Sequence, residues 1–122
     1  MKWQRGPLFC AQAVLSLVTL VTATAGAAGT NTLRELHDWC KEPHNSPRSG
    51  YCLGYVTGVA EMMLKLGRDH PDDPHGICGE PTRGALVQTF VNWAEKHPEE
   101  WRSSDHFGVL TALAETWHCP AK

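Results

Sequence analysis

Four cysteines spread along a short chain constrain its fold more than any other feature. The chain has 122 residues, and Cys40, Cys52, Cys78 and Cys119 follow an early cysteine at position 10. Small exported domains commonly use disulfides to stabilise a core of modest size. Because no Cys-x-x-Cys occurs, the spacing is not that of a typical zinc site. The four later cysteines therefore predict two disulfides in an exported protein.

The first 28 residues have the pattern of a secretory signal peptide. The basic start MKWQR precedes a largely apolar stretch, PLFCAQAVLSLVTLVTATA, and Ala25-Gly26-Ala27 best matches a signal peptidase site. A membrane anchor is the alternative, because the apolar run approaches the length that spans a bilayer. The small residues and the lack of a basic stop favour cleavage. We predict a signal peptide over residues 1–28 and a periplasmic domain over residues 29–122 that does not contact the membrane.

The charge of this mature domain excludes several classes of partner. Removing Lys2 and Arg5 lowers the number of basic residues from 11 to 9, against 13 acidic residues, so the net charge is about −4. No basic run remains. Nucleic acids and anionic membrane surfaces are therefore poor candidates, whereas a basic protein partner is compatible with this balance.

The apolar residues recur with helical periodicity in four segments. We expect helices over about 31–40, 51–66, 81–96 and 104–117, with residues 41–50 and 68–76 as loops. The expected core residues of the second helix are Tyr51, Tyr55, Val59, Met62 or Met63, and Leu66, and those of the last helix are Phe107, Leu110, Ala114 and Trp117. The sequence thus predicts an all-α fold, a small antiparallel four-helix bundle.

The helix order selects one of the three possible disulfide pairings. The first helix ends where the second begins, and the third begins where the fourth ends, so the cysteines fall into two pairs at opposite ends of the bundle. Either other pairing would have to bridge the length of the second helix, about 24 Å for 16 residues. Disulfide Cα atoms lie only about 4.4–6.8 Å apart. We therefore predict Cys40–Cys52 and Cys78–Cys119.

Three glycines recur at every fourth position of the second helix. Gly50, Gly54 and Gly58 fall on one helical face, although each interior glycine costs about 1 kcal/mol relative to alanine. A face without side chains allows another helix to approach its backbone closely. The stripe therefore predicts helix packing, either inside the chain or at the seam of a dimer.

The sequence gives little support for an enzyme or for a cofactor. It contains no nucleophile elbow, no His-Glu-x-x-His and no phosphate-binding glycine loop. The segment DHPDDPH carries carboxylates and imidazoles that a metal would accept, but its composition is also that of an ordinary solvated loop, which is the interpretation we adopt. We expect no catalytic residue, no bound metal and no cofactor.

Three stretches resemble the Rap/Tai immunity family of small exported helical proteins. They are CLGYVTGVA, CGEPTRGALVQTFVNWAEKHPE and the ending ALAETWHCP, and the resemblance runs from about Leu33 to Pro120. Two positions depart from the family pattern. Trp93 stands where tyrosine or phenylalanine is expected, and Trp117 where phenylalanine is commoner. Both changes keep an aromatic side chain.

The resemblance implies a type VI secretion immunity protein. Characterised members protect bacteria against amidase effectors that cut peptidoglycan peptides, so the resemblance implies an all-helical fold, a periplasmic location, a protein partner and a homodimer. It identifies no contact residues. Two segments are candidates for the contact, residues 68–79 and residues 97–105, and we favour the first because it is acidic and stiffened by proline. Its candidate residues are Asp69, His70, Asp72, Asp73 and His75. A stress or chaperone-like protein, and an envelope interaction module, are the alternatives.

Overall fold

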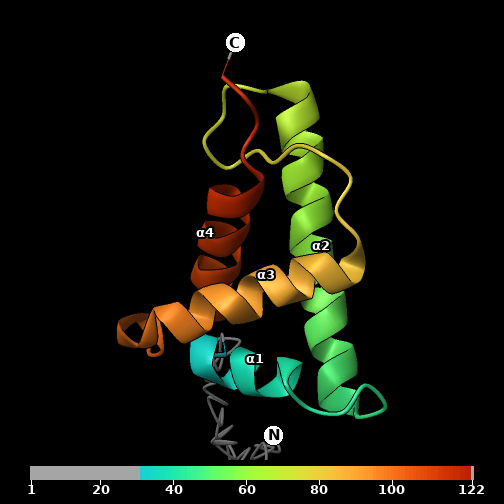
Figure 1. The fold of residues 1–122 in the computed structure, drawn as a ribbon, viewed down its shortest axis with the longest axis vertical. Helices are drawn as coiled ribbons and strands as arrows, with labels where there is room; N and C mark the ends of the chain where they lie inside the picture. The colour runs from blue at the N-terminus through green and yellow to red at the C-terminus, as the bar shows by residue number, and fades with distance from the viewer. Residues whose placement is uncertain (1–30, 122) are drawn as a thin grey trace, which may run out of the picture.

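Residues 31–121 form four α-helices and one short 3₁₀ helix. In this computed structural model the helices are α1 (Leu33–Cys40), α2 (Pro47–Asp69), α3 (Arg83–Lys96), η1 (Pro98–Glu100) and α4 (Asp105–Trp117) (Figure 1). No strand occurs among these residues, so the predicted all-α class is confirmed. The predicted signal peptide, residues 1–28, lies outside the described residues.

The second helix is longer than its apolar pattern predicts. Ser46 Oγ accepts a hydrogen bond from Ser49 N, and Pro47 occupies the first helical turn, so α2 begins ahead of the predicted start at Tyr51. Proline suits this place because its missing N–H has no helical partner there. The helix also continues to Asp69, past the predicted end. The prediction of a loop was therefore wrong for residues 47–50 and for residues 68–69.

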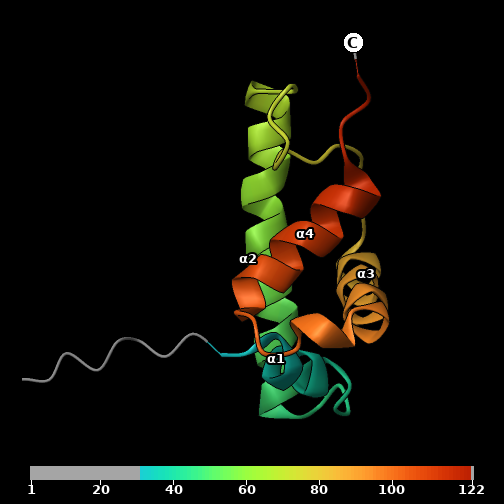
Figure 2. The ribbon, with the colours of Figure 1, turned by 90° about the vertical axis from the view of Figure 1, so that its left-hand side faces the viewer.

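The helices are arranged in two directions. Figures 1 and 2 show α2 along the long axis of the molecule, α4 beside it, and α1 and α3 lying across it. Thr32 pairs with Ser104 in an isolated antiparallel bridge, which fixes the start of α1 against the start of α4. A second bridge, between Ile77 and His118, fixes the segment before α3 against the end of α4. A backbone bridge thus fixes each end of α4 to another segment of the chain.

Both predicted disulfides are confirmed. Cys40 and Cys52 join the end of α1 to the first half of α2, with Cα atoms 5.2 Å apart. Cys78 and Cys119 join the segment before α3 to the end of the chain, with Cα atoms 4.8 Å apart. The two disulfides lie at opposite ends of the molecule, as the helix order predicted.

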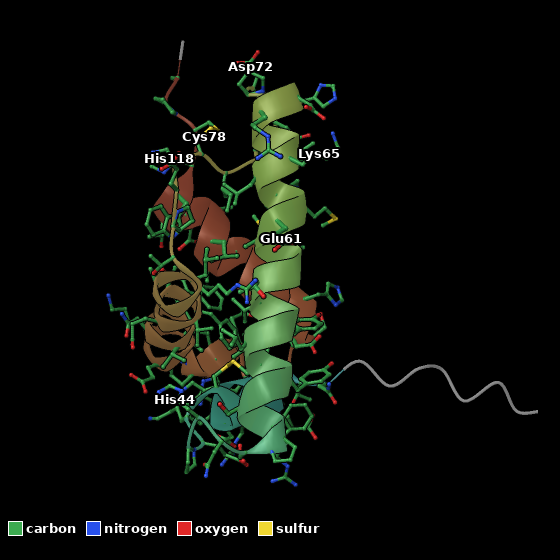
Figure 3. The ribbon with its side chains drawn as sticks, turned by 90° about the vertical axis from the view of Figure 1, so that its right-hand side faces the viewer. His44, Glu61, Lys65, Asp72, Cys78 and His118 are labelled. Atoms are coloured by element: carbon green, nitrogen blue, oxygen red, sulfur yellow. A yellow bond between two sulfur atoms is a disulfide. The ribbon has the colours of Figure 1, made fainter. Side chains whose placement is uncertain are left out.

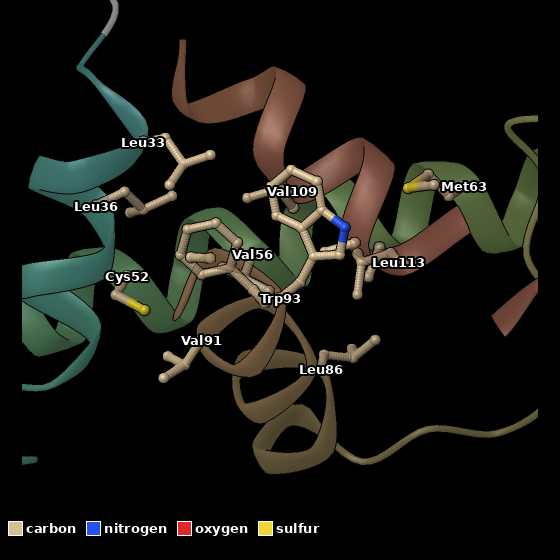
Figure 4. Packing of buried hydrophobic residues seen from close by; sticks show 14 of the residues in the cluster. Leu33, Leu36, Cys52, Val56, Met63, Leu86, Val91, Trp93, Val109 and Leu113 are labelled. Carbon is tan, nitrogen blue, oxygen red and sulfur yellow. The ribbon is translucent and has the colours of Figure 1, made fainter. Parts of the chain in front are cut away.

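The core of α2 and α4 agrees only in part with the residues that the sequence predicted. Tyr51 is 44% exposed, Met62 63% and Phe107 42%, so these residues do not belong to the buried core. The buried residues of α2 and α4 are instead Cys52, Val56, Thr57, Ala60, Met63, Gly67, Asp105, Gly108, Val109, Ala112 and Leu113 (Figure 4). Many of these side chains are small, which lets the helices approach one another around the fully buried Phe90. The prediction was therefore wrong for Tyr51, Met62 and Phe107 and correct for Met63. The other predicted residues that pack against the core are half-buried, namely Tyr55, Val59, Leu110, Ala114 and Trp117.

Close packing depends on two glycines outside the predicted stripe. A β-carbon added to Gly67 would lie 3.0 Å from the backbone carbon of Ile77 and 2.9 Å from Cys119 Sγ. A β-carbon added to Gly108 would lie 2.9 Å from Leu33 Cγ. Gly67 therefore lies inside α2, although the predicted helix ends at residue 66, and it allows the following loop to pass close to α2.

Candidate functional site

The glycine stripe lies on the outer face of α2. Gly50, Gly54 and Gly58 are exposed, and a β-carbon added to any of them would meet nothing within 4 Å apart from its own stretch of helix. The part of the chain that the structure describes therefore does not pack on this stripe. Of the two predicted contacts, packing inside the chain is not seen among residues 31–121, and packing against a second molecule stays a prediction.

The candidate residues begin at the last residue of α2, Asp69, and continue into the loop that follows it. Asp69, His70, Asp72 and His75 are exposed, and Asp73 is half-buried. Figure 3 shows Asp72 at this end of the molecule, where the chain leaves α2. The structure therefore places these side chains together at one tip, where a partner has access to them.

Two local contacts shape this loop. Asp73 Oδ1 accepts a hydrogen bond from His75 N at 2.8 Å, which closes a turn. Lys65 donates a hydrogen bond to Asp69, and this bond, followed by the charge of Lys65, lowers the pKa of the Asp69 carboxyl. Asp69 is therefore ionised at neutral pH. Its charge is partly balanced within α2, whereas no basic group among residues 31–121 forms an ion pair with the carboxylate of Asp72.

The second candidate segment, residues 97–105, is held by Trp101. The indole Nε1 donates a hydrogen bond to the Ala94 carbonyl at 2.9 Å, and the His37 ring stacks on the indole with 5.8 Å between centroids. The Arg34 guanidinium lies 5.2 Å from the indole ring centroid. This turn is therefore anchored on α1 and α3, and it is not a freely projecting loop.

A serine, a histidine and an aspartate lie close together at the start of α4, as they do in the catalytic triad of a hydrolase. Ser104 Oγ lies 3.3 Å from His106 Nε2, and His106 Nδ1 lies 3.9 Å from Asp105 Oδ1. The second distance is too long for a hydrogen bond. Asp105 instead accepts hydrogen bonds from the Tyr55 hydroxyl and from the backbone of His106. These contacts stabilise the helix start, and they do not link a base to an orienting carboxylate.

A cleft of about 660 Å³ lies between the first half of α2, α3 and the turn that joins α1 to α2. Its apolar lining includes Leu53 from α2 and Val87 and Val91 from α3. Leu53 is 40% exposed, so part of its apolar side chain faces the open cleft. The cleft was not predicted. Its signal in the sequence is Leu53 itself, which falls outside the apolar stripe of α2.

Charged residues surround one end of this cleft. Lys41 Nζ lies 2.8 Å from Glu95 Oε1, and Arg48 donates a hydrogen bond to Glu42 at 3.2 Å. The hydrogen bond from Lys41, and then a contact with His37, lower the pKa of the Glu95 carboxyl. The acidic groups at this rim are thus paired with basic groups of the same chain.

Residues 31–121 show no sign of a metal centre or of a membrane span. No three His, Cys, Asp or Glu side chains in this range gather as a metal site would require. Within the same range, no helix combines the length and the apolar character needed to cross a bilayer. The candidate functional sites in this range are therefore surface features, namely the acidic loop, the glycine stripe and the cleft.

Comparison with known proteins supports one family. The model of the Rap1a immunity proteins matches residues 32–119, a range that includes all four helices and both disulfides. No curated protein and no solved structure gives a significant match. Because the matched range covers well over half of the sequence, the chain belongs to the Rap1a immunity protein family.

Proposed function

We propose that this protein is a periplasmic immunity protein that binds a type VI secretion amidase effector and blocks its peptidoglycan-cleaving site by steric occlusion. The family match over residues 32–119 carries this proposal, because an immunity protein acts by binding a protein effector. Two disulfides suit an exported protein, because such bonds persist in oxidising compartments. The protein acts by binding and not by catalysis.

The construction of the domain suits steric inhibition. One disulfide fixes α1 to α2, and the other fixes the segment before α3 to the chain end, so the surfaces between them are pre-organised. A rigid binder loses less conformational entropy on association than a flexible one does. The inhibitor therefore needs no conformational change to present its contact surface.

The first candidate contact is the acidic loop. Its exposed carboxylates, Asp69 and Asp72, fit a basic patch on the effector. Changing both to asparagine keeps the shape of each side chain and removes its charge, so it should slow association with the amidase and reduce its salt dependence. Asp38→Asn with Glu35→Gln, on α1, is a control that removes the same charge elsewhere. If the loop variant and this control bind alike, the loop is not the contact.

The second candidate contact is the glycine stripe, which we assign to a homodimer seam. Close approach of two copies of α2 would cover the exposed backbone at Gly54 and Gly58. Gly58→Leu should then shift the mass in solution from dimer to monomer, as measured by sedimentation. A monomeric wild-type protein would contradict this assignment and would leave the inhibitor proposal intact.

A growth assay tests the function in its compartment. A peptidoglycan amidase effector, encoded beside this protein and directed to the periplasm, should lyse the cells that express it. Co-expression of the full chain should restore growth, and a version without residues 1–28 should not, because it would remain in a different compartment from the effector. Lysis in the presence of the full, secreted chain would overturn the proposal.

A further inference from the structure

The cleft between α2 and α3 is large enough to receive part of a partner. Its volume of about 660 Å³ lies in the range of pockets that bind small molecules and peptide side chains. Leu53 is exposed at its edge, and Val87 and Val91 line it from α3. An exposed leucine beside two valines gains most from a contact that removes apolar surface from water.

Two glycines keep this cleft open. Gly50 on α2 and Gly84 on α3 both line it, and a β-carbon added to either would meet nothing within 4 Å. Each helix is continuous through its glycine, and neither glycine has a positive φ. Backbone strain therefore does not require glycine at these positions, and a larger side chain there would project into free space.

The charges at the rim favour an occupant that carries no charge. Lys41 is paired with Glu95 at 2.8 Å, and Glu42 with Arg48 at 3.2 Å. An uncharged apolar side chain entering the cleft leaves both ion pairs intact. A charged side chain would have to compete with an existing ion pair for its counter-charge, and His44 is the further titratable side chain of the lining that it would meet.

The walls of the cleft are fixed before any partner binds. The Cys40–Cys52 disulfide lines the cleft and ties the end of α1 to α2, and Val91 is buried in the core. Figure 3 shows this side of the molecule, with α3 beside α2 and His44 in the turn that precedes α2. A rigid concave site of this kind suits an anchor residue of a protein interface.

We infer that the cleft receives an uncharged apolar anchor side chain, aliphatic or aromatic, of the amidase effector. This inference rests on the proposed function for the identity of the partner. The partner then contributes an apolar side chain that projects into the cleft. This contact is separate from the acidic loop at the other end of α2, which binds basic residues of the partner.

The experiment fills the cleft without disturbing the fold. Gly84→Leu places a leucine in the cleft, and Asn92→Leu places the same side chain on an exposed position of the same helix outside the cleft. Gly84→Leu should weaken binding of the purified amidase at least about thirtyfold, the loss expected of an anchor contact, while Asn92→Leu should bind within about threefold of wild type. Equal affinities for the two variants would overturn the inference.

A second arm does not depend on the amidase. N-acetyl-phenylalanine amide, a neutral mimic of an apolar side chain, is titrated at millimolar concentrations while backbone amide resonances are followed by NMR. The amides of Leu53, Val87 and their neighbours should shift in wild type and in Asn92→Leu, and they should not shift in Gly84→Leu. N-acetyl-glutamate amide should have no effect. If the phenylalanine mimic leaves these resonances unchanged, the cleft is not an apolar site and the inference fails.

The two experiments together distinguish a failure of the proposed function from a failure of the inference about the cleft. If the amidase does not bind wild type but the phenylalanine mimic enters the cleft, the proposed function fails and the effector is the wrong partner. If wild type is a dimer that Gly84→Leu dissociates, the occupant is a second copy of this chain, and the inference about the effector is overturned.

Discussion

The Tyr55 hydroxyl donates a hydrogen bond to Oδ1 of Asp105 at 3.1 Å, joining the first half of α2 to the first residue of α4. Asp105 is only 3% exposed, so its carboxylate depends on donors from the protein. Burial, and then the charge of Asp105, raise the pKa of Tyr55 well above its ordinary 10.0. The hydroxyl is therefore protonated at neutral pH and acts as a hydrogen-bond donor.

Removing this hydroxyl should destabilise the fold. Tyr55→Phe keeps the ring and leaves the buried carboxylate one donor short, which costs about 1–3 kcal/mol of the free energy of unfolding. Tyr51→Phe is the matched control, because the Tyr51 hydroxyl only accepts a hydrogen bond from Asn31 in an exposed place. Urea unfolding of both variants measures the difference. Equal losses for the two would show that the contact with Asp105 contributes nothing specific.

The two disulfides should differ in their contributions. Cys40–Cys52 spans 12 residues and Cys78–Cys119 spans 41. The loop-closure model gives about 3 kcal/mol for the shorter loop and about 4 kcal/mol for the longer one. Guanidinium unfolding of the paired alanine variants should show the larger loss for Cys78→Ala with Cys119→Ala. The reverse order would mean that effects in the folded state outweigh chain entropy here.

Substitution of single glycines should separate the open stripe from the packed positions. Gly54→Ala meets no neighbour and improves helix propensity, so it should stabilise the monomer by about 1 kcal/mol. Gly67→Ala would overlap the backbone of Ile77, and such overpacking costs about 1–3 kcal/mol. Thermal and chemical unfolding measure both changes. Stabilisation by Gly67→Ala would contradict the close approach of the loop to α2.

The acid side of the stability profile should depend on Glu95. Its pKa lies below the ordinary 4.5 because Lys41, and then His37, donate hydrogen bonds to it. A lowered pKa in the folded state means that this contribution is fully present above pH 4.5 and is lost as the pH falls through the folded value. Lys41→Ala should raise the pKa of Glu95 toward 4.5, as followed by the carboxyl carbon resonance during a pH titration.

The control for this titration is on another helix. The hydrogen bond from Lys65 lowers the pKa of Asp69, so Lys65→Ala should raise that pKa. The same substitution should leave the pKa of Glu95 unchanged. An unchanged Glu95 titration in Lys41→Ala would show that the 2.8 Å contact does not persist in solution.

Spacing and order in the sequence were sufficient to predict the elements and their covalent links. Apolar periodicity located the four helices, and the order of their ends selected the two disulfides. Helix starts were harder to predict, because Ser46 and Pro47 act through local backbone geometry that composition assigns to a loop. Family resemblance named the class of protein that the match over residues 32–119 then confirmed.

Which face of a helix is buried could not be predicted from residue size. Tyr51 and Phe107 are large and apolar, yet Ala60 and Gly108 lie in the core because close helix contacts need small side chains. The cleft was missed for a related reason. It depends on Leu53 and Gly84, which are brought together by the crossing of α3 over α2, and a one-dimensional pattern does not contain that crossing.

We propose that this chain occludes an amidase, and a titration of peptidoglycan cleavage measures that occlusion. The purified mature protein is added in steps to a fixed amount of a purified type VI secretion amidase effector, and release of cleaved muropeptides is measured. We expect the amidase activity to fall linearly and to vanish near one inhibitor per active site. Undiminished cleavage in the presence of a large excess of folded, disulfide-bonded protein would contradict it.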